Sequence, residues 1–329
     1  MNWLVKAAVQ KGVSALPAAE RANYLFQRHV TRTLPIGEAG VARKLERALE
    51  HVRAYRRHGP GRPLGDAVFY EFGAGWDLAV PLAHAALGVG GQVLVDIRPN
   101  VRLELVNATL ATLARRRAPL EEETGEPLRD LGPPDVGTLD ELEGRFGISY
   151  LAPRDARRTG LPAASVDLVS STNTLEHVPE GDIGPILAEC ARLLRPDGVM
   201  SFRIDMQDHA SYSDGRVSAY NFLRFSDPAW RLVSSRLGYQ NRLRLPDYRR
   251  IFREAGLEAV AENVTWPSDE DLAALERLDL APRFRAYSRD ELAARVQEVV
   301  LRPSLPDRAQ ERENVGRRGG ARVGPRAGS

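Results

Sequence analysis

Residues 68–77 read Val-Phe-Tyr-Glu-Phe-Gly-Ala-Gly-Trp-Asp, an apolar run that ends near an acid and is followed by two glycines one residue apart. The run predicts a buried strand, and the helical pattern after it predicts a strand–turn–helix unit. Gly73 and Gly75 suit a tight turn at which the backbone closely approaches a ligand. The third glycine of a dinucleotide-binding turn is absent, because Leu78 and Ala79 stand at its place. This absence disfavours a pyrophosphate packed on the helix.

The alternation of strands and helices continues toward the C-terminus. Residues 118–146, rich in Glu, Pro and Gly, are interpreted as a surface insertion with a short helix at 139–145. The alternation predicts an α/β fold, a Rossmann-like, doubly wound, mostly parallel sheet with helices on both faces. Strands are expected at 67–72, 92–96, 148–151, 166–171, 199–204 and 257–264, and helices at 77–87, 101–117, 183–194, 248–255 and 289–300.

Changes in composition divide the chain into three regions. Residues 1–63 are expected to form an N-terminal helical cap, with helices at 1–16 and 41–57 and a Gly/Pro-rich boundary at 59–63. Residues 64–307 form the α/β domain, with a ligand-binding core at 64–206 and a substrate-shaping region at 207–256. Residues 308–329, rich in Arg and Gly, are expected to be a disordered basic tail.

The composition of the 329 residues limits the classes of ligand and compartment. Lys plus Arg is 46 and Asp plus Glu is 44, so a net charge of +2 favours a small ligand over long nucleic acid. Cys190 is the only cysteine, which excludes an intramolecular disulfide and suits a reducing, cytoplasmic compartment. We expect no integral membrane association. The segment 1–16 is interpreted as a helix packed over the main domain, with a transit peptide or surface attachment as alternatives.

Three acids follow predicted parallel strands. Glu71 ends the first, Asp96 closes the second 21 positions beyond Gly75, and Asp155 follows the third. Each alone could cap a helix or lie in a solvated loop. Together they converge on the crevice at the carboxyl ends of the strands, where open α/β sheets bind ligands. A sulfonium cation is better served by such carboxylates than by phosphate-binding lysines, and no Lys follows Lys44.

These motifs, over about residues 64–206, resemble the class I S-adenosylmethionine-dependent methyltransferases, in particular a type 11-like subgroup of bacterial glycan and natural-product enzymes. The similar stretches are 71–76, 95–97, 155–156, 166–178 and 193–199. The resemblance implies S-adenosylmethionine as cofactor and S-adenosylhomocysteine as product. Asp77 departs from the family, where many relatives carry Gly, and this puts the local turn geometry in doubt. The implied cofactor-binding residues are Glu71, Gly73 and Gly75 for the methionine part, Asp96 for the ribose, Ile97, Asp155 and Ala156 for the adenine, Thr172 and Asn173 as cover, His177 at the edge, and Trp76 as a subgroup feature.

The acceptor side is predicted from the segment after the fifth strand. His209 is the candidate general base, because its unperturbed pKa suits proton abstraction near neutrality, and Asp208 lies beside it. The alternative is a histidine merely hydrogen-bonded to a loop acid. Asp205, Tyr220, Asn221, Arg224, Asn241 and Arg242 are the candidate substrate residues, which could instead only tie loops together. No metal is expected, since no ligand spacing supports a site at Glu176, His177 and Asp208.

The expected reaction is in-line transfer of a methyl group to a small-molecule acceptor, most simply a hydroxyl of a sugar, glycoside or other natural-product intermediate. The alternatives are an N- or C-methyltransferase of a natural product and a non-catalytic module that binds the cofactor. A nicotinamide-dependent oxidoreductase is disfavoured by the missing third glycine. RNA methylation would require the basic tail, and no nucleic acid partner is expected. The sequence leaves the oligomeric state open.

Overall fold

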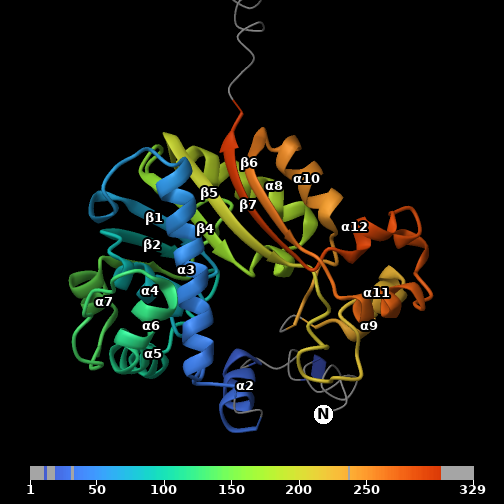
Figure 1. The fold of residues 1–329 in the computed structure, drawn as a ribbon, viewed down its shortest axis with the longest axis horizontal. Helices are drawn as coiled ribbons and strands as arrows, with labels where there is room; N and C mark the ends of the chain where they lie inside the picture. The colour runs from blue at the N-terminus through green and yellow to red at the C-terminus, as the bar shows by residue number, and fades with distance from the viewer. Residues whose placement is uncertain (1–10, 13–18, 31–32, 236–237, 305–329) are drawn as a thin grey trace, which may run out of the picture.

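The structure is a computed structural model that describes residues 11–12, 19–30, 33–235 and 238–304. Its centre is a sheet with the strand order β3-β2-β1-β4-β5-β7-β6 (Figure 1). The strands β1 to β5 pair in parallel, whereas β7 pairs antiparallel with both β5 and β6. The strands are β1 Val68–Phe72, β2 Gly91–Val95, β3 Ile148–Leu151, β4 Val166–Thr172, β5 Leu194–Asp205, β6 Leu257–Thr265 and β7 Val296–Pro303.

Helices cover both faces of this sheet, as the alternating sequence pattern predicts. Phe69 packs into a core that α3, α4 and α5 share, and the next residue, Tyr70, packs into a second core that α8 and α10 share. Successive side chains of a strand point to opposite faces, so the two cores lie on opposite sides of the sheet. The Rossmann-like, mostly parallel α/β fold is therefore confirmed. The helices are α2 Ala19–Leu25, α3 Glu38–His58, α4 Ala79–Leu87, α5 Leu103–Arg115, α6 Arg117–Thr124, α7 Leu139–Phe146, α8 Glu180–Leu193, α9 Asp227–Val233, α10 Leu245–Glu254, α11 Asp269–Glu276 and α12 Arg289–Ala293, with short helices η1 Phe26–Val30, η2 Leu64–Asp66, η3 Leu175–His177, η4 Asn221–Arg224 and η5 Pro282–Phe284.

The interpretation of residues 118–146 as a surface insertion is wrong. The segment forms α6 and α7, and Leu120, Leu142 and Phe146 are buried in the same core as α3 and α4. Its charged residues hid this pattern, because the buried side chains are separated by exposed Glu and Pro residues. The segment is thus the part of the β2–β3 connection that follows α5, and the short helix predicted at 139–145 is confirmed as α7.

The helix predicted at 289–300 is also wrong beyond its first turn. Only Arg289–Ala293 is helical, where Ser288 accepts a hydrogen bond from the Glu291 N–H as a cap. Val296–Pro303 instead forms β7, inserted between β5 and β6. The run is rich in valine, and its strand form is decided by pairing with two partners that are far away in the sequence.

A third core belongs to a smaller lobe beside the carboxyl ends of β4 and β5. It joins η4, α11, η5 and α12 through buried residues such as Tyr220, Phe222 and Phe284 (Figure 1). The lobe therefore combines the connection between β5 and α10 with the connection between β6 and β7. Lys11 Nζ donates to the backbone carbonyls of Arg231 (2.9 Å) and Leu232 (2.5 Å), which places Lys11 against α9.

Two predictions fall outside the described residues: most of the N-terminal helix at 1–16, and the tail at 308–329. In the part of the chain that the structure describes, no helix is both long enough and apolar enough to cross a bilayer.

Candidate active site

The turn between β1 and α4 has the geometry that its glycines predict. Gly73 has a φ of +77° and Gly75 a φ of +82°. A Cβ at Gly73 would lie 2.5 Å from Thr174 Cγ2, so only glycine fits between β1 and the loop after β4. A Cβ at Gly75 would meet no heavy atom of the described residues within 4 Å. The backbone at Gly75 therefore borders open space, in which a ligand can approach it closely.

Glu71 lies in β1 just before this turn. Its side chain is 3 % exposed, and Oε2 has no hydrogen-bond partner among the described residues. Burial raises the pKa of Glu71 to about 8, while Lys44 of α3 opposes the shift and Asp96, just after β2, adds to it. A buried carboxyl without a partner is costly unless a ligand satisfies it. A cationic ligand would do so.

Asp96 follows the last residue of β2 and is 6 % exposed. It accepts a hydrogen bond from Tyr150 Oη of β3 at 3.2 Å, and Tyr150 also accepts one from the Asn100 N–H at 3.0 Å. Burial raises the pKa of Asp96 to about 7, against the lowering effect of Tyr150. Ile97, the next residue, is 65 % exposed. An oriented carboxylate beside an exposed apolar side chain suits a ribose joined to a flat aromatic base.

The other predicted cofactor residues differ in their burial and in the partners that their side chains already have. Trp76 is half-buried, with its ring 5.5 Å from that of Tyr24. Asp155 is tied to Arg157 at 2.6 Å, and hydrogen bonds from Arg157 hold the pKa of Asp155 below its usual value. Ala156, also half-buried, packs against the core on the α8 face.

The loop after β4 approaches the glycine turn. Thr172 bonds to His51 Nε2 of α3 at 3.0 Å. Asn173 has a φ of +54°, and its Oδ1 is buried with no partner in the described part of the chain. The strained backbone and the unpaired amide oxygen are features of a residue that meets a ligand.

These observations show that the residues fit S-adenosylmethionine. The cofactor has a sulfonium and an ammonium group, and Glu71 Oε2 and Asn173 Oδ1 are acceptors for them that have no hydrogen-bond partner among the described residues. Gly75 leaves space for it, and Asp96 can accept hydrogen bonds from ribose hydroxyls. When bound, the cofactor supplies the transferable methyl group.

A pocket of about 380 Å³ lies between α3 and the carboxyl ends of β4 and β5. Its walls include Thr172, Asn173 and Asp205 from the strands, and Tyr212 from the following loop. The residues from α3 and β5 add four cationic side chains: Arg43, Lys44, Arg47 and Arg203. The pocket thus adjoins the proposed cofactor residues and carries an excess of positive charge on its wall.

Asp205 is the hub of hydrogen bonds on this wall. It accepts from Tyr212 Oη at 2.5 Å and from the Gln207 N–H at 3.0 Å, and His209 Nε2 lies 3.4 Å from its Oδ2. Although burial raises it, the pKa of Asp205 lies below its ordinary value because His209, Tyr212 and the Gln207 N–H stabilise the carboxylate. His209 lies behind Asp205 rather than among the pocket-lining residues.

Asp208 and the remaining predicted substrate residues mostly hold the small lobe together. Asp208 accepts from Asn221 Nδ2 at 2.9 Å, and burial raises its pKa. Arg242 is 3 % exposed and bonds Asp227 and two backbone carbonyls. Tyr220 and Asn241 donate to backbone carbonyls, while Arg224 is exposed and lies over the Phe225 ring. None of these five side chains, from Tyr220 to Arg242, is among the residues that line the 380 Å³ pocket in the described structure.

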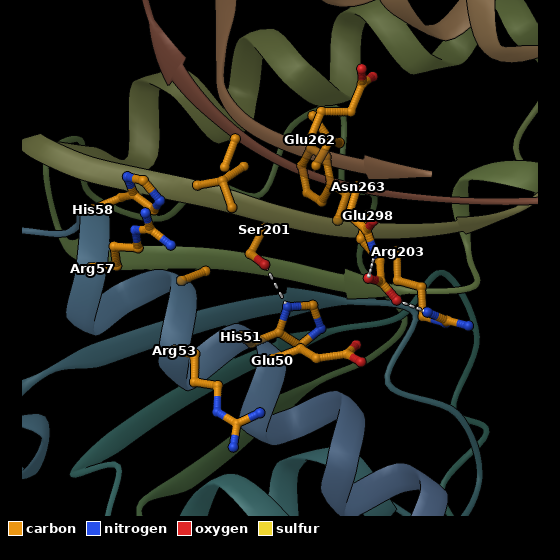
Figure 2. Close-up of a pocket in the computed structure, with 15 residues that line it drawn as sticks. Glu50, His51, Arg53, Arg57, His58, Ser201, Arg203, Glu262, Asn263 and Glu298 are labelled. Carbon is orange, nitrogen blue, oxygen red and sulfur yellow. Dashed lines mark hydrogen bonds and ion pairs between the residues drawn. The ribbon is translucent and has the colours of Figure 1, made fainter. Parts of the chain in front are cut away.

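A larger pocket of about 440 Å³ lies away from the strand ends, between α3 and the sheet surface of β5, β7 and β6 (Figure 2). His51 bonds Ser201 Oγ at 2.8 Å at its base, as Figure 2 shows. Burial lowers the pKa of His51 well below its ordinary value. This histidine links α3 to β4 and β5, which fixes the wall that both pockets share.

Sequence reasoning missed the contribution of α3 and of Tyr212. Arg43 and Arg47 are four residues apart, so the helical pattern itself places them on one face. Nothing in the sequence around Arg43 and Arg47 indicates that this face of α3 lies beside β4 and β5. Tyr212 lies in an irregular loop, where its contact with Asp205 depends on the path of the whole segment.

Comparison with known proteins agrees with this site. Residues 138–202 match the family described as methyltransferase domain. No curated protein matches the chain in sequence.

Three solved structures illustrate the resemblance in fold. An N1-methyltransferase of 1,6-didemethyltoxoflavin from Burkholderia thailandensis has 17% identity over 88% of this chain and 89% of its own, with a TM-score of 0.42. An S-adenosylmethionine-dependent methyltransferase from Mesorhizobium loti has 17% identity over 77% and 97%, with a TM-score of 0.39. The [4+2]-cyclase SpnF has 14% identity over 82% and 83%, with a TM-score of 0.43. At these scores the three resemblances say nothing about the substrate or reaction of this chain.

The family match covers β3 and β4 and reaches into β5, and the glycine turn and acidic strand ends stand at the places that the resemblance implies. Residues 138–202 are therefore similar to a methyltransferase domain, and the turn and strand-end residues before them fit the cofactor of such domains, S-adenosylmethionine.

Proposed function

We propose that the chain transfers the methyl group of S-adenosylmethionine to a hydroxyl of a small acceptor that also carries a carboxylate or phosphate. The observation that carries this proposal is the 380 Å³ pocket beside the cofactor residues. Pockets for small molecules typically measure about 300–1,000 Å³. The volume thus supports a small acceptor, in keeping with a sugar, glycoside or other natural-product intermediate.

The charge of the pocket wall supports an anionic group on the acceptor. Four cationic side chains line the pocket, against the single carboxylate of Asp205. Glu50 pairs with Arg47 at 2.5 Å, and Glu298 pairs with Arg203 and, at 3.7 Å, with Arg47, which offsets the charge of these two arginines. Lys44 faces Glu71 across the cofactor side. Arg43, exposed on α3, is the side chain best suited to bind the anion, because a guanidinium can form two parallel hydrogen bonds to it.

Asp205 and Tyr212 are suited to orient the acceptor hydroxyl, because both lie on the pocket wall and bond each other. Methyl transfer gains most of its rate from holding the acceptor oxygen in line with the methyl group. The role of His209 as general base, with Asp208 beside it, stays a prediction. A proton from the pocket would reach His209 only past Asp205.

Paired acceptors test the proposal. Release of S-adenosylhomocysteine is measured with hydroxylated compounds that carry a carboxylate or phosphate and with their neutral amides or unphosphorylated forms. Arg43→Gln should raise KM for the anionic member about tenfold or more, the effect of losing a charge-assisted hydrogen bond, and leave the neutral member unchanged. Arg53→Gln, an exposed arginine on the same helix outside this pocket, is the matched control.

The product then separates the alternatives. A methyl carbon bonded to oxygen in the product NMR spectrum supports O-methylation, whereas a bond to nitrogen or carbon replaces it with the other transfer classes. Cofactor binding without turnover on any acceptor would favour a non-catalytic binding module. Equal KM values of Arg43→Gln and wild type for anionic acceptors would contradict the proposed substrate class.

A further inference from the structure

We propose that Glu176, His177 and His209 form a binding site for one divalent transition-metal ion. Glu176 and His177 come from η3, directly after β4, and His209 comes from the loop after β5. One ligand atom from each residue lies within 4.8 Å of the other two. Three atoms 4.8 Å apart lie about 2.8 Å from their common centre, so a movement of about 0.7 Å by each would bring them to the bonding distance of about 2.1 Å.

Unsatisfied polar atoms point into this cluster. Glu176 is 2 % exposed, and neither of its carboxyl oxygens has a hydrogen-bond partner in the described residues. His209 Nε2 is also buried, and it has no aligned hydrogen bond in the described structure, although Asp205 Oδ2 lies 3.4 Å from it. Buried carboxyl groups and imidazoles normally have partners, and each unpaired group costs stability. One cation between them would satisfy all of these atoms.

His177 is oriented as metal-binding histidines usually are. Its Nδ1 lies 2.6 Å from the backbone carbonyl of Tyr239, which fixes the proton on Nδ1 and leaves the Nε2 lone pair free. Its ring centroid is 5.0 Å from that of His209. Asp208, a partner of Glu176 and His177 in the sequence-based alternative, bonds Asn221 and the Ala210 N–H instead.

The donor set indicates the class of metal. Two imidazoles and one carboxylate suit Zn²⁺, Fe²⁺ or Mn²⁺, whereas Mg²⁺ and Ca²⁺ prefer oxygen ligands alone. The inference contradicts the expectation of no metal, which rested on sequence spacing. His209 is separated from Glu176 by more than thirty residues, and only the fold brings the two together.

A role of the ion in methyl transfer rests on the proposed function, whereas the binding of the ion does not. Asp205 Oδ2 lies 3.4 Å from His209 Nε2 and also lines the acceptor pocket. An ion in the cluster would therefore place positive charge directly behind the residue that orients the acceptor oxygen. His209 would then be a ligand, because the ion and a proton compete for the same Nε2 lone pair.

Calorimetry with Zn²⁺ on the full chain, treated first with a chelator, tests the site without any acceptor or cofactor. We expect one ion per chain, and a loss of affinity of at least tenfold in Glu176→Gln and in His177→Ala. His58→Gln, a histidine of α3 outside the cluster, should bind as wild type does. Mg²⁺ should bind at least tenfold more weakly than Zn²⁺.

Unfolding curves of each variant without metal establish that it is folded, and Glu176→Gln keeps the volume of the side chain. Unchanged Zn²⁺ affinity in Glu176→Gln, or no stoichiometric binding to the wild type, would overturn the site. Methyl transfer is measured in a separate assay. If no acceptor is methylated, the proposed function is wrong, but the Zn²⁺ affinities still decide whether the metal site exists.

Discussion

Replacing Glu71 by Gln should remove the larger part of the pH dependence of cofactor binding and leave a smaller part from Asp96, whose pKa is about 7. Glu71 has a pKa of about 8 because it is buried, and the charged groups that act on it are Lys44 of α3, which lowers the pKa, and Asp96, just after β2, which raises it. The cationic cofactor favours the ionised form of Glu71. Below pH 8, binding must therefore release the proton that Glu71 carries in the free protein.

The size of the effect follows from this pKa. With a pKa of about 8, about 1% of Glu71 is ionised at pH 6.0 and about a quarter at pH 7.5. The affinity for S-adenosylmethionine should rise about 25-fold over this range, which corresponds to about 1.9 kcal/mol. Glu71→Gln should lose this contribution and bind more weakly at pH 7.5.

Calorimetric titration at several pH values between 6.0 and 7.5 measures the effect, and two buffers of different ionisation enthalpy count the protons released. Wild type should release about 0.9 proton from Glu71 on binding at pH 7.0. Asp77→Asn, an acid in the same turn that caps Ala79 and keeps this acceptor as Asn, is the matched control. The same pH dependence in Glu71→Gln as in wild type would refute the reasoning.

Two further predictions concern stability. Since burial raises the pKa values of both Glu71 and Asp96, their contribution to the stability of the cofactor-free protein is complete below their unfolded-state pKa values of about 4. It declines as the pH rises above that value and is fully lost above pH 7 to 8. At pH 8.5, Glu71→Gln should therefore have a free energy of unfolding, measured by denaturant titration, that exceeds that of wild type by at most about 5 kcal/mol. A less stable variant at that pH would contradict this account. Gly73→Ala should lose about 1–3 kcal/mol, because its φ is +77° and the new Cβ would collide with Thr174. Gly144→Ala, in α7 with no described heavy atom within 4 Å of the new Cβ, should be neutral or slightly stabilising in the same denaturation assay.

The sequence predicted the parts of the fold that local pattern controls. The strand at Val68–Phe72 and the turn at Gly73 and Gly75 are visible because apolar runs and glycines have local meanings. The same holds for the acids at the strand ends, which parallel topology brings to one edge. β7 was missed because its strand form depends on pairing with β5 and β6, and a run of valines between charged residues is compatible with either structure.

The acceptor side was less predictable for the same reason. Asn241 and Arg242 looked like substrate residues because they are polar among aromatics, yet they bond backbone carbonyls inside the small lobe. Arg43 of α3 lines the pocket although it lies more than 120 residues from Thr172. Contacts over such separations are set by packing, and nothing in the local sequence records them.

The most direct test of the central claim is calorimetric titration of the purified chain with S-adenosylmethionine, S-adenosylhomocysteine and NAD, with Asp96→Ala for comparison. The account predicts binding of both adenosyl ligands, weaker binding of NAD, and a loss of adenosyl affinity in Asp96→Ala, whose buried carboxylate stands at the end of β2. No adenosyl binding, or a preference for NAD, would contradict the assignment of the cofactor site.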